Sequence, residues 1–133
     1  MKKELIIFLA GFVLVVVIFN YFNFKSQGVK LINADEFETL MNEKGIFVVQ
    51  AHTPYEKEIE GTDLIVEDWE NMQNSIEKIP SDKNTKILVY CRSGRMSAIS
   101  SQQLADMGYK NVYDLKGGMN SWEESGRKLA QAK

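Results

Sequence analysis

The chain has 133 residues, of which 44% are hydrophobic and 26% are charged. These proportions are typical of a single globular domain and exclude a disordered chain. The formal net charge is −2, and no run of lysine or arginine indicates a nucleic-acid partner. Because Cys91 is the only cysteine and His52 the only histidine, an intramolecular disulfide and a metal site built from several thiolates or imidazoles are excluded. We therefore expect no metal and no cofactor of that kind.

The N-terminal segment is apolar on every helical face. Residues 5–22 read LIIFLAGFVLVVVIFNYF, and a helix of this length spans roughly 27 Å, close to the hydrocarbon thickness of a bilayer. Lys2 and Lys3 precede the apolar run, which favours a cytoplasmic N-terminus. The segment predicts one transmembrane helix over residues 1–24, with the remainder anchored on the extracytoplasmic side.

A cleaved signal peptide is the alternative for the same segment. Ser26-Gln27-Gly28 has the small-x-small pattern that a signal peptidase accepts. In that case the domain is secreted or periplasmic. The apolar run is longer than the roughly 7–15 residues of a signal-peptide core, which favours the anchor.

Strand and helix patterns alternate after a predicted linker at residues 25–29. Apolar runs predict strands at 30–32, 46–49, 64–66, 87–90 and 112–115. Helices are expected after Asn33, at 69–79, at 97–107 and around Trp122; Asn33 and Glu36 have capping-box spacing, and Gly45 is the expected stop of the first. The alternation predicts a mostly parallel sheet with helices on both faces, an α/β/α domain at 30–127 followed by a tail at 128–133.

Cys91 stands where the fourth predicted strand ends. In open parallel sheets the ligand crevice lies beyond the carboxyl ends of the strands. The loop that follows ends at a helix N-terminus, whose N–H groups and dipole favour an anion, and Arg92 and Arg95 add positive charge. Gly94 permits a tight turn. These features favour a reactive thiolate, although a single cysteine at a strand end is also often a small core residue.

Three stretches of the sequence resemble single-domain rhodaneses, which are sulfurtransferases of the thiosulfate:cyanide type. Residues 89–98, VYCRSGRMSA, resemble the active-site loop. Residues 107–115 with Gly117-Gly118-Met119 and Trp122 are similar to the C-terminal signature of the family, and residues 48–56 lie where the family has a "DVR-P-E" pattern. The resemblance covers roughly residues 31–126, nearly all of the chain after the apolar segment.

The resemblance implies a three-layer rhodanese-like fold and a double-displacement mechanism. Cys91 is then the nucleophile, which takes sulfane sulfur from a donor such as thiosulfate and passes it to cyanide or a cellular thiol. The implied substrate-binding residues form the loop after it: Arg92, Ser93, Gly94, Arg95, Met96 and Ser97. No cofactor or metal is implied, and a single domain of this kind is expected to be monomeric.

The sequence departs from the family pattern at three positions. Met96 stands where many members have an arginine, which leaves the donor preference open. Gln50 and His52 replace the usual aspartate and arginine; we interpret both as structural, with His52 expected to be a solvated loop side chain. Seven acidic residues are interpreted as a solvated rim rather than a cation site: Glu56, Glu58, Glu60, Asp63, Glu67, Asp68 and Glu70.

Two other functions compete with sulfur transfer. A related phosphatase of the cell-cycle type needs an arginine six residues after the cysteine, and Ser97 occupies that position. The stronger alternative is a module without turnover that presents Cys91 as a sulfur carrier or a redox-sensitive thiol. Because the chain has no second cysteine, an oxidised form of Cys91 would have to be resolved by an outside thiol.

Overall fold

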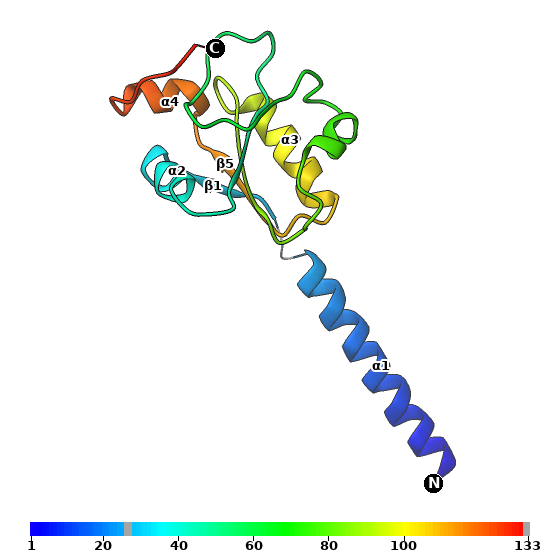
Figure 1. The fold of residues 1–133 in the computed structure, drawn as a ribbon. Helices are drawn as coiled ribbons and strands as arrows, with labels where there is room; N and C mark the ends of the chain where they lie inside the picture. The colour runs from blue at the N-terminus through cyan, green and yellow to red at the C-terminus, as the bar shows by residue number, and fades with distance from the viewer. Residues whose placement is uncertain (26–27, 132–133) are drawn as a thin grey trace.

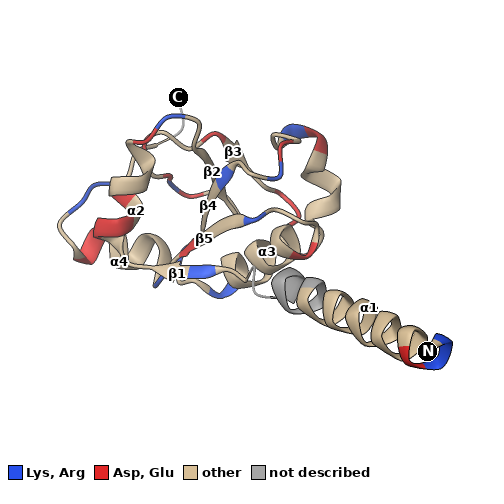
Figure 2. Ribbon diagram, turned by 90° about the horizontal axis from the view of Figure 1, so that it is seen from below, with Lys and Arg blue, Asp and Glu red and all other residues tan. Residues whose placement is uncertain are grey.

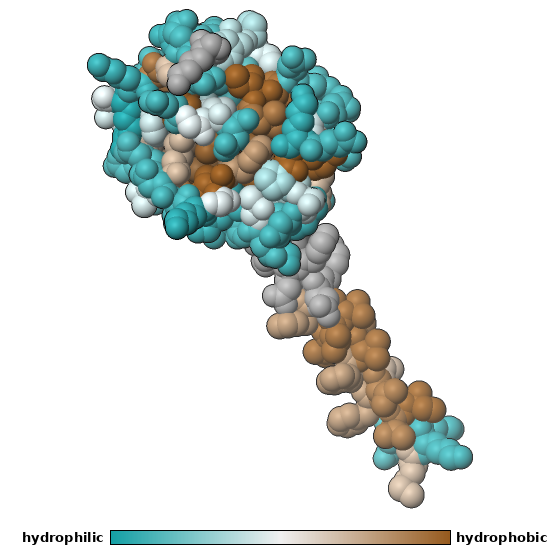
Figure 3. Space-filling view, viewed as in Figure 1, coloured by the Kyte–Doolittle hydropathy of each residue, from teal (hydrophilic) through white to brown (hydrophobic). Residues whose placement is uncertain are grey.

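The computed structural model describes residues 1–25 and 28–131, without the side chains of residues 20–25. Helix α1 (Lys2–Lys25) stands outside the domain formed by the rest of the chain (Figure 1). Figure 3 shows apolar side chains along α1, whereas the visible domain surface is mainly hydrophilic.

The predicted transmembrane helix is not confirmed. Among the described residues, no helix combines the length and the apolar character that crossing a membrane requires. The first turn of α1 carries Lys2, Lys3 and Glu4, which lower the hydropathy of its described part. Ser26 and Gln27, two of the three residues of the predicted cleavage pattern and two of the five of the predicted linker, lie outside the described residues.

A five-stranded sheet forms the centre of the domain. Its strands are β1 (Lys30–Ile32), β2 (Phe47–Gln50), β3 (Leu64–Ile65), β4 (Lys86–Tyr90) and β5 (Asn111–Leu115). They lie in the order β1-β5-β4-β2-β3, and every neighbouring pair is parallel. Val89 of β4 lies between Val49 of β2 and Asp114 of β5. The predicted parallel sheet is confirmed, and β4, which leads to Cys91, occupies its middle.

Helices cover both faces of the sheet, as expected for three layers (Figure 1). On one face, α2 (Ala34–Met41) and α4 (Gly118–Glu124) pack through Phe37 and Trp122 on Leu88 and Tyr90. On the other face, α3 (Arg95–Asp106) and the 3-10 helix η1 (Met72–Lys78) pack on alternate side chains of the same strands. The residues of β4 alternate between the two cores because successive side chains of a strand point to opposite faces.

The start of α2 follows the predicted capping box. The Glu36 backbone N–H donates to Asn33 Oδ1 at 2.9 Å, and the Asn33 N–H donates to Glu36 Oε2 at 3.2 Å. The helix ends at Met41 with Asn42 as its C-cap, so the predicted stop at Gly45 is wrong. Gly45 instead has a φ of 75° in the turn before β2.

Two further helix predictions need correction. The pattern at 69–79 forms the short 3-10 helix η1 and not an α-helix. In α3 the buried face consists of Ser97, Ser100, Ser101 and Leu104. The apolar residues of this stretch are the buried candidates that its sequence predicts, and of these Ala98 and Ile99 are exposed, whereas Ala105 and Met107 are partly buried against the core. Ile99 is 42% exposed. Serines occupy the buried face because nearby carbonyl groups accept their hydroxyls, as Trp69 O does for Ser100 Oγ at 2.8 Å.

Candidate active site

Cys91 follows the last residue of β4 at the carboxyl end of the sheet. It is a free cysteine with 1% of its surface exposed. The backbone N–H of Gly94 donates a hydrogen bond to Cys91 Sγ at 3.0 Å. Because α3 begins at the next residue, the sulfur lies beside a helix N-terminus, where the first N–H groups have no partners within the helix. This position suits a sulfur anion.

Gly94 makes this tight loop possible. Its φ of 101° lies in the left-handed region, which residues with a Cβ rarely adopt. A Cβ at this position would lie 3.5 Å from the backbone nitrogen of Gly117. The loop that carries the cysteine therefore packs against the loop that precedes α4.

The first residues of α4 hold the cysteine loop from behind. The N–H of Met119 donates to the carbonyl of Cys91 at 2.8 Å, and the N–H of Asn120 donates to the carbonyl of Arg92 at 3.0 Å. A Cβ on Gly118 would lie 2.3 Å from the Cys91 carbonyl oxygen. These contacts turn two carbonyl groups of the loop toward α4, and only glycine allows the approach.

A buried acid lies below the loop on β5. Asp114 is 2% exposed, and its Oδ1 has no hydrogen-bond partner among the described residues. Burial raises the pKa of Asp114 to about 6, partly offset by hydrogen bonds from Ser97 and the backbone of Leu115. Ser97 is fully buried in the first turn of α3, and its hydroxyl donates to the carbonyl of Gly94 at 3.4 Å. Ser97 therefore connects Asp114 to the loop.

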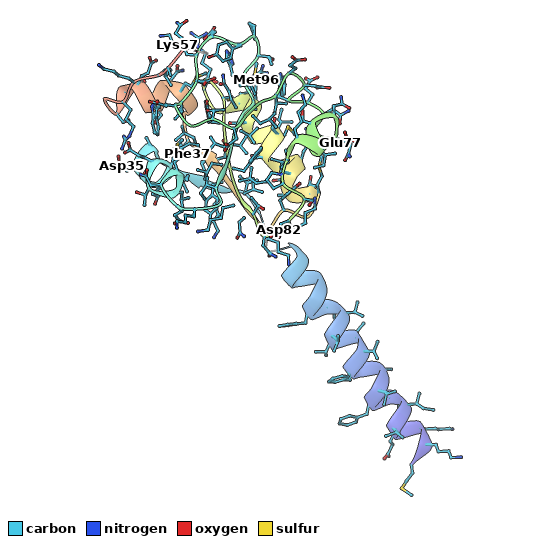
Figure 4. All side chains as sticks on the ribbon, in the orientation of Figure 1. Asp35, Phe37, Lys57, Glu77, Asp82 and Met96 are labelled. Carbon is cyan, nitrogen blue, oxygen red and sulfur yellow. The ribbon has the colours of Figure 1, made fainter. Side chains whose placement is uncertain are left out.

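Both arginines of the loop have partners outside it. Arg92 Nη1 lies 3.2 Å from Glu56 Oε1, with both side chains about half exposed. The Arg95 guanidinium lies 5.8 Å from the centre of the Trp69 ring, a cation–π distance. Met96, the position at which the family often has an arginine, is half-buried at the same end of the domain as Lys57 (Figure 4).

Gln50 and Tyr90 form a buried polar network behind the site. The Gln50 amide donates to the carbonyl of Lys57 at 2.9 Å, and its Oε1 accepts from the Tyr90 hydroxyl at 3.2 Å. The same hydroxyl accepts the N–H of Ile59 at 2.9 Å and lies 2.6 Å from Thr62 Oγ1. These contacts fix the segment that carries Glu56, and they agree with the structural interpretation of Gln50.

His52 differs from its predicted state. It lies two residues beyond the end of β2 and is 7% exposed, so it is buried and not solvated. Its buried Nε2 has no hydrogen-bond partner among the described residues and lies 3.7 Å from Glu56 Oε2. His52 and Arg92 thus stand on two sides of one carboxylate.

A polar cavity of about 370 Å³ adjoins the loop between Ser93 and the start of α4. Lys116, Asn120 and Glu124 contribute charged or polar groups to its wall. Cys91 is not among its lining residues, so it is a neighbour of the sulfur site. Among the residues that the structure describes, no group of three or more His, Cys, Asp or Glu side chains is arranged to hold a metal ion.

Most residues of the candidate active site are neighbours in the sequence and were predicted to lie together. The structure places residues 91–94 in the loop between β4 and α3 and residues 95–97 in the first turn of α3, which begins two residues before its predicted start. Glu56 and Asp114 were not singled out as site residues. In the sequence, Glu56 is one of seven acidic residues, and nothing there indicates that it pairs with Arg92. Asp114 lies within the predicted strand NVYDL, where an acidic residue in an apolar run was the one signal that could have identified it.

Two proteins of known name are similar to this chain in sequence. A tRNA uridine(34) hydroxylase of Leptospira interrogans is 34% identical over 98 residues, which cover 70% of this chain and 27% of that protein. A thiosulfate sulfurtransferase GlpE of Coxiella burnetii is 42% identical over 43 residues, 32% of this chain and 40% of that protein. The chain therefore spans less than half the length of either relative.

The fold agrees with these matches. The crystal structure of a rhodanese-related protein from Thermoplasma volcanium superposes with a TM-score of 0.64 at 24% identity, covering 77% of this chain and 99% of that one. The family model of the rhodanese-like domain matches residues 33–125 of the sequence, a range that includes all the site residues described above. Since that match covers most of the sequence, the chain belongs to the family of rhodanese-like domains.

Proposed function

We propose that the domain is a sulfurtransferase that carries sulfane sulfur as a persulfide on Cys91. The observation that supports this most directly is the hydrogen bond from the Gly94 N–H to Cys91 Sγ, 3.0 Å long, at the N-terminus of α3. A donor aimed at sulfur stabilises a thiolate and, one atom further out, a persulfide anion. The curated relative of Coxiella burnetii is named a thiosulfate sulfurtransferase, which agrees with this chemistry.

The reaction has two displacements. In the first, the Cys91 thiolate attacks the outer sulfur of thiosulfate; the S–S bond to the sulfonate sulfur breaks, and sulfite leaves with the electron pair. In the second, cyanide or a thiolate attacks the outer sulfur of the Cys91 persulfide, the persulfide bond breaks, and the Cys91 thiolate leaves. The acceptor becomes thiocyanate or a new persulfide. Each step conserves charge and needs no other oxidant or reductant.

The loop has three roles in this proposal. Gly94 and the first N–H groups of α3 bind the terminal sulfur. Ser97 fixes the loop through Gly94 O, and α4 holds the carbonyls of Cys91 and Arg92 away from the sulfur. Arg92, Ser93, Arg95 and Met96 form the entrance, where the donor approaches.

The test uses the full chain with thiosulfate and cyanide, and the formation of thiocyanate is followed over time. We expect turnover that falls by roughly a thousandfold or more in Cys91→Ser, because the nucleophile is lost. Equal turnover in Cys91→Ser would refute the persulfide mechanism. A gain of one sulfur atom on Cys91 in the mass spectrum after thiosulfate alone checks the first displacement.

A carrier or redox-sensing module without turnover is the second candidate. It is favoured by the burial of Cys91, which is 1% exposed, because a large acceptor then reaches the sulfur only after it has been extended by a persulfide. Loading of Cys91 without subsequent release to cyanide or small thiols would establish this candidate. A phosphatase is not favoured, because the sixth position after the cysteine holds the buried Ser97 and no guanidinium.

The location of the domain stays a prediction. We propose that the domain acts outside the cytoplasm, either attached to the membrane or released after cleavage of the N-terminal segment. The proposal is based on the apolar run that follows Lys2 and Lys3. Protease sensitivity of the domain in cells with an intact cytoplasmic membrane would check this location. The expected monomeric state is checked by size-exclusion chromatography with light scattering.

A further inference from the structure

One of the two positive charges after Cys91, that of Arg92, is paired with a carboxylate at the entrance to the site. Arg92 Nη1 lies 3.2 Å from Glu56 Oε1. Such an exposed ion pair contributes little to stability. At a distance of several ångströms, however, the charge of the carboxylate cancels that of the guanidinium, whichever rotamers are populated. The Arg92–Glu56 pair therefore attracts an approaching anion only weakly.

Glu56 is held at this place by the fold. The buried Nε2 of His52 lies 3.7 Å from Glu56 Oε2, on the other side of the carboxylate from Arg92. The neighbouring backbone is fixed by Gln50, which donates to Lys57 O. A freely moving loop would not keep a carboxylate next to Arg92, whereas this one does.

The wider surroundings of the entrance are acidic. The segment 52–70 carries seven acidic side chains and one lysine, Lys57, which itself lies 3.9 Å from Glu123 Oε1. This segment contacts the cysteine loop through Glu56 and contacts α3 through Trp69 and Glu70. Figure 2 shows acidic residues along the loops next to β2 and β3. Met96 adds an uncharged side chain where the loop meets solvent.

We propose that Glu56 is a specificity-determining residue that makes the site favour sulfur donors of low negative charge, namely persulfides of small thiols, over the thiosulfate dianion. The inference rests on the proposed persulfide chemistry of Cys91. In the step concerned, the Cys91 thiolate attacks the outer sulfur of R–S–S⁻, the S–S bond breaks, and the thiolate R–S⁻ leaves. Charge is conserved, and a persulfide with an uncharged R group brings one negative charge less past Glu56 than thiosulfate does.

The experiment measures how fast each donor loads Cys91 in the full chain. The donors are thiosulfate, the persulfide of cysteamine and the persulfide of 3-mercaptopropionate, mixed with protein, quenched, and scored by the gain of one sulfur in the mass spectrum. The two persulfides react through the same bond but carry an ammonium or a carboxylate. We expect the second-order rate constant to be higher for cysteamine persulfide, whose net charge is zero, than for 3-mercaptopropionate persulfide and thiosulfate, which each carry two negative charges.

Glu56→Gln tests the residue itself. Removing one negative charge near the path should raise the thiosulfate rate relative to the cysteamine persulfide rate by about five- to tenfold at low salt, and less at 0.5 M salt. Glu77→Gln is the matched control, because Glu77 belongs to η1 on another side of the domain (Figure 4). It should leave the ratio of the two rates unchanged.

The outcomes separate this inference from the function on which it rests. If no donor loads Cys91, the proposed function fails and the inference fails with it. If the donors load Cys91 at rates that ignore their charge, or Glu56→Gln and Glu77→Gln change the ratio equally, sulfur transfer stands and the role of Glu56 is refuted.

Discussion

The approach of α4 to the cysteine loop predicts a large effect of Gly118→Ala. The new Cβ would lie 2.3 Å from the carbonyl oxygen of Cys91. It would also lie 2.7 Å from both the carbonyl carbon and the carbonyl oxygen of Arg92. An ordinary contact requires roughly 1 Å more. The φ of 58° at Gly118 adds the strain of a left-handed conformation, which costs about 1–2 kcal/mol for a residue with a Cβ.

The two effects are expected to add. Overpacking a tight contact costs about 1–3 kcal/mol, so Gly118→Ala should lower the free energy of unfolding by about 2–5 kcal/mol. A displacement of the sulfur cradle by about 1 Å should lower the rate of sulfur loading by about a hundredfold. Urea unfolding and the mass-spectrometric loading assay measure the two quantities.

Gly126→Ala is the matched control. Its φ is 88°, but a Cβ there would have no heavy atom within 4 Å. It should therefore show the conformational strain alone, about 1–2 kcal/mol, with unchanged loading. If Gly118→Ala and Gly126→Ala lose the same stability and both load sulfur at the rate of the parent chain, the proposed clamp on the Cys91 and Arg92 carbonyls is refuted.

Two other substitutions test the buried polar groups. Tyr90→Phe removes the hydroxyl that accepts the Ile59 N–H and should lower the free energy of unfolding by about 1–3 kcal/mol by leaving that buried donor unpaired. Tyr55→Phe, which removes an exposed hydrogen bond to Glu58 Oε2, is the control, and a midpoint of urea unfolding equal to that of the control would contradict the prediction. Burial raises the pKa of Asp114 from 3.8 to about 6 in the folded state, so the folded protein binds this proton more tightly than the unfolded chain does. The free energy of unfolding should therefore fall by about 3 kcal/mol as the pH rises from about 4 through 6. Asp114→Asn should abolish this decline in urea unfolding measured at pH 4.5 and 7.5, and parallel pH profiles for both chains would show that Asp114 is not the cause.

Most of the fold could be predicted from local patterns. Unbroken apolar runs around Val49 and Val89 predict β2 and β4. The Asn33–Glu36 capping box is a short-range signal, and the structure forms it at the predicted residues. The buried face of α3 could not be predicted, because its serines look polar until Trp69 O is known to accept from Ser100. Which face of α3 is buried depends on these tertiary hydrogen bonds, and hydropathy alone does not reveal them.

The site shows the same division. The cysteine loop is contiguous in sequence, so the turn at Gly94 could be placed from spacing alone, whereas α3 begins at Arg95, two residues before its predicted start. Glu56 and Asp114 reach the loop from other elements. Their contributions depend on which strand ends adjoin β4, which periodicity does not reveal.

The clamp on the Cys91 and Arg92 carbonyls also bears on the synthesis of the protein. Gly118, Met119 and Asn120, which complete the cradle, follow Cys91 by more than twenty residues. During translation the thiol therefore emerges before its supports exist, and in that interval it resembles a cysteine of an unfolded chain. Under the proposed function, sulfur loading therefore requires that the last helix has been made and has docked. For the same reason, the ten-residue stretch around Cys91 transplanted into another protein would carry the cysteine without the contacts from α4.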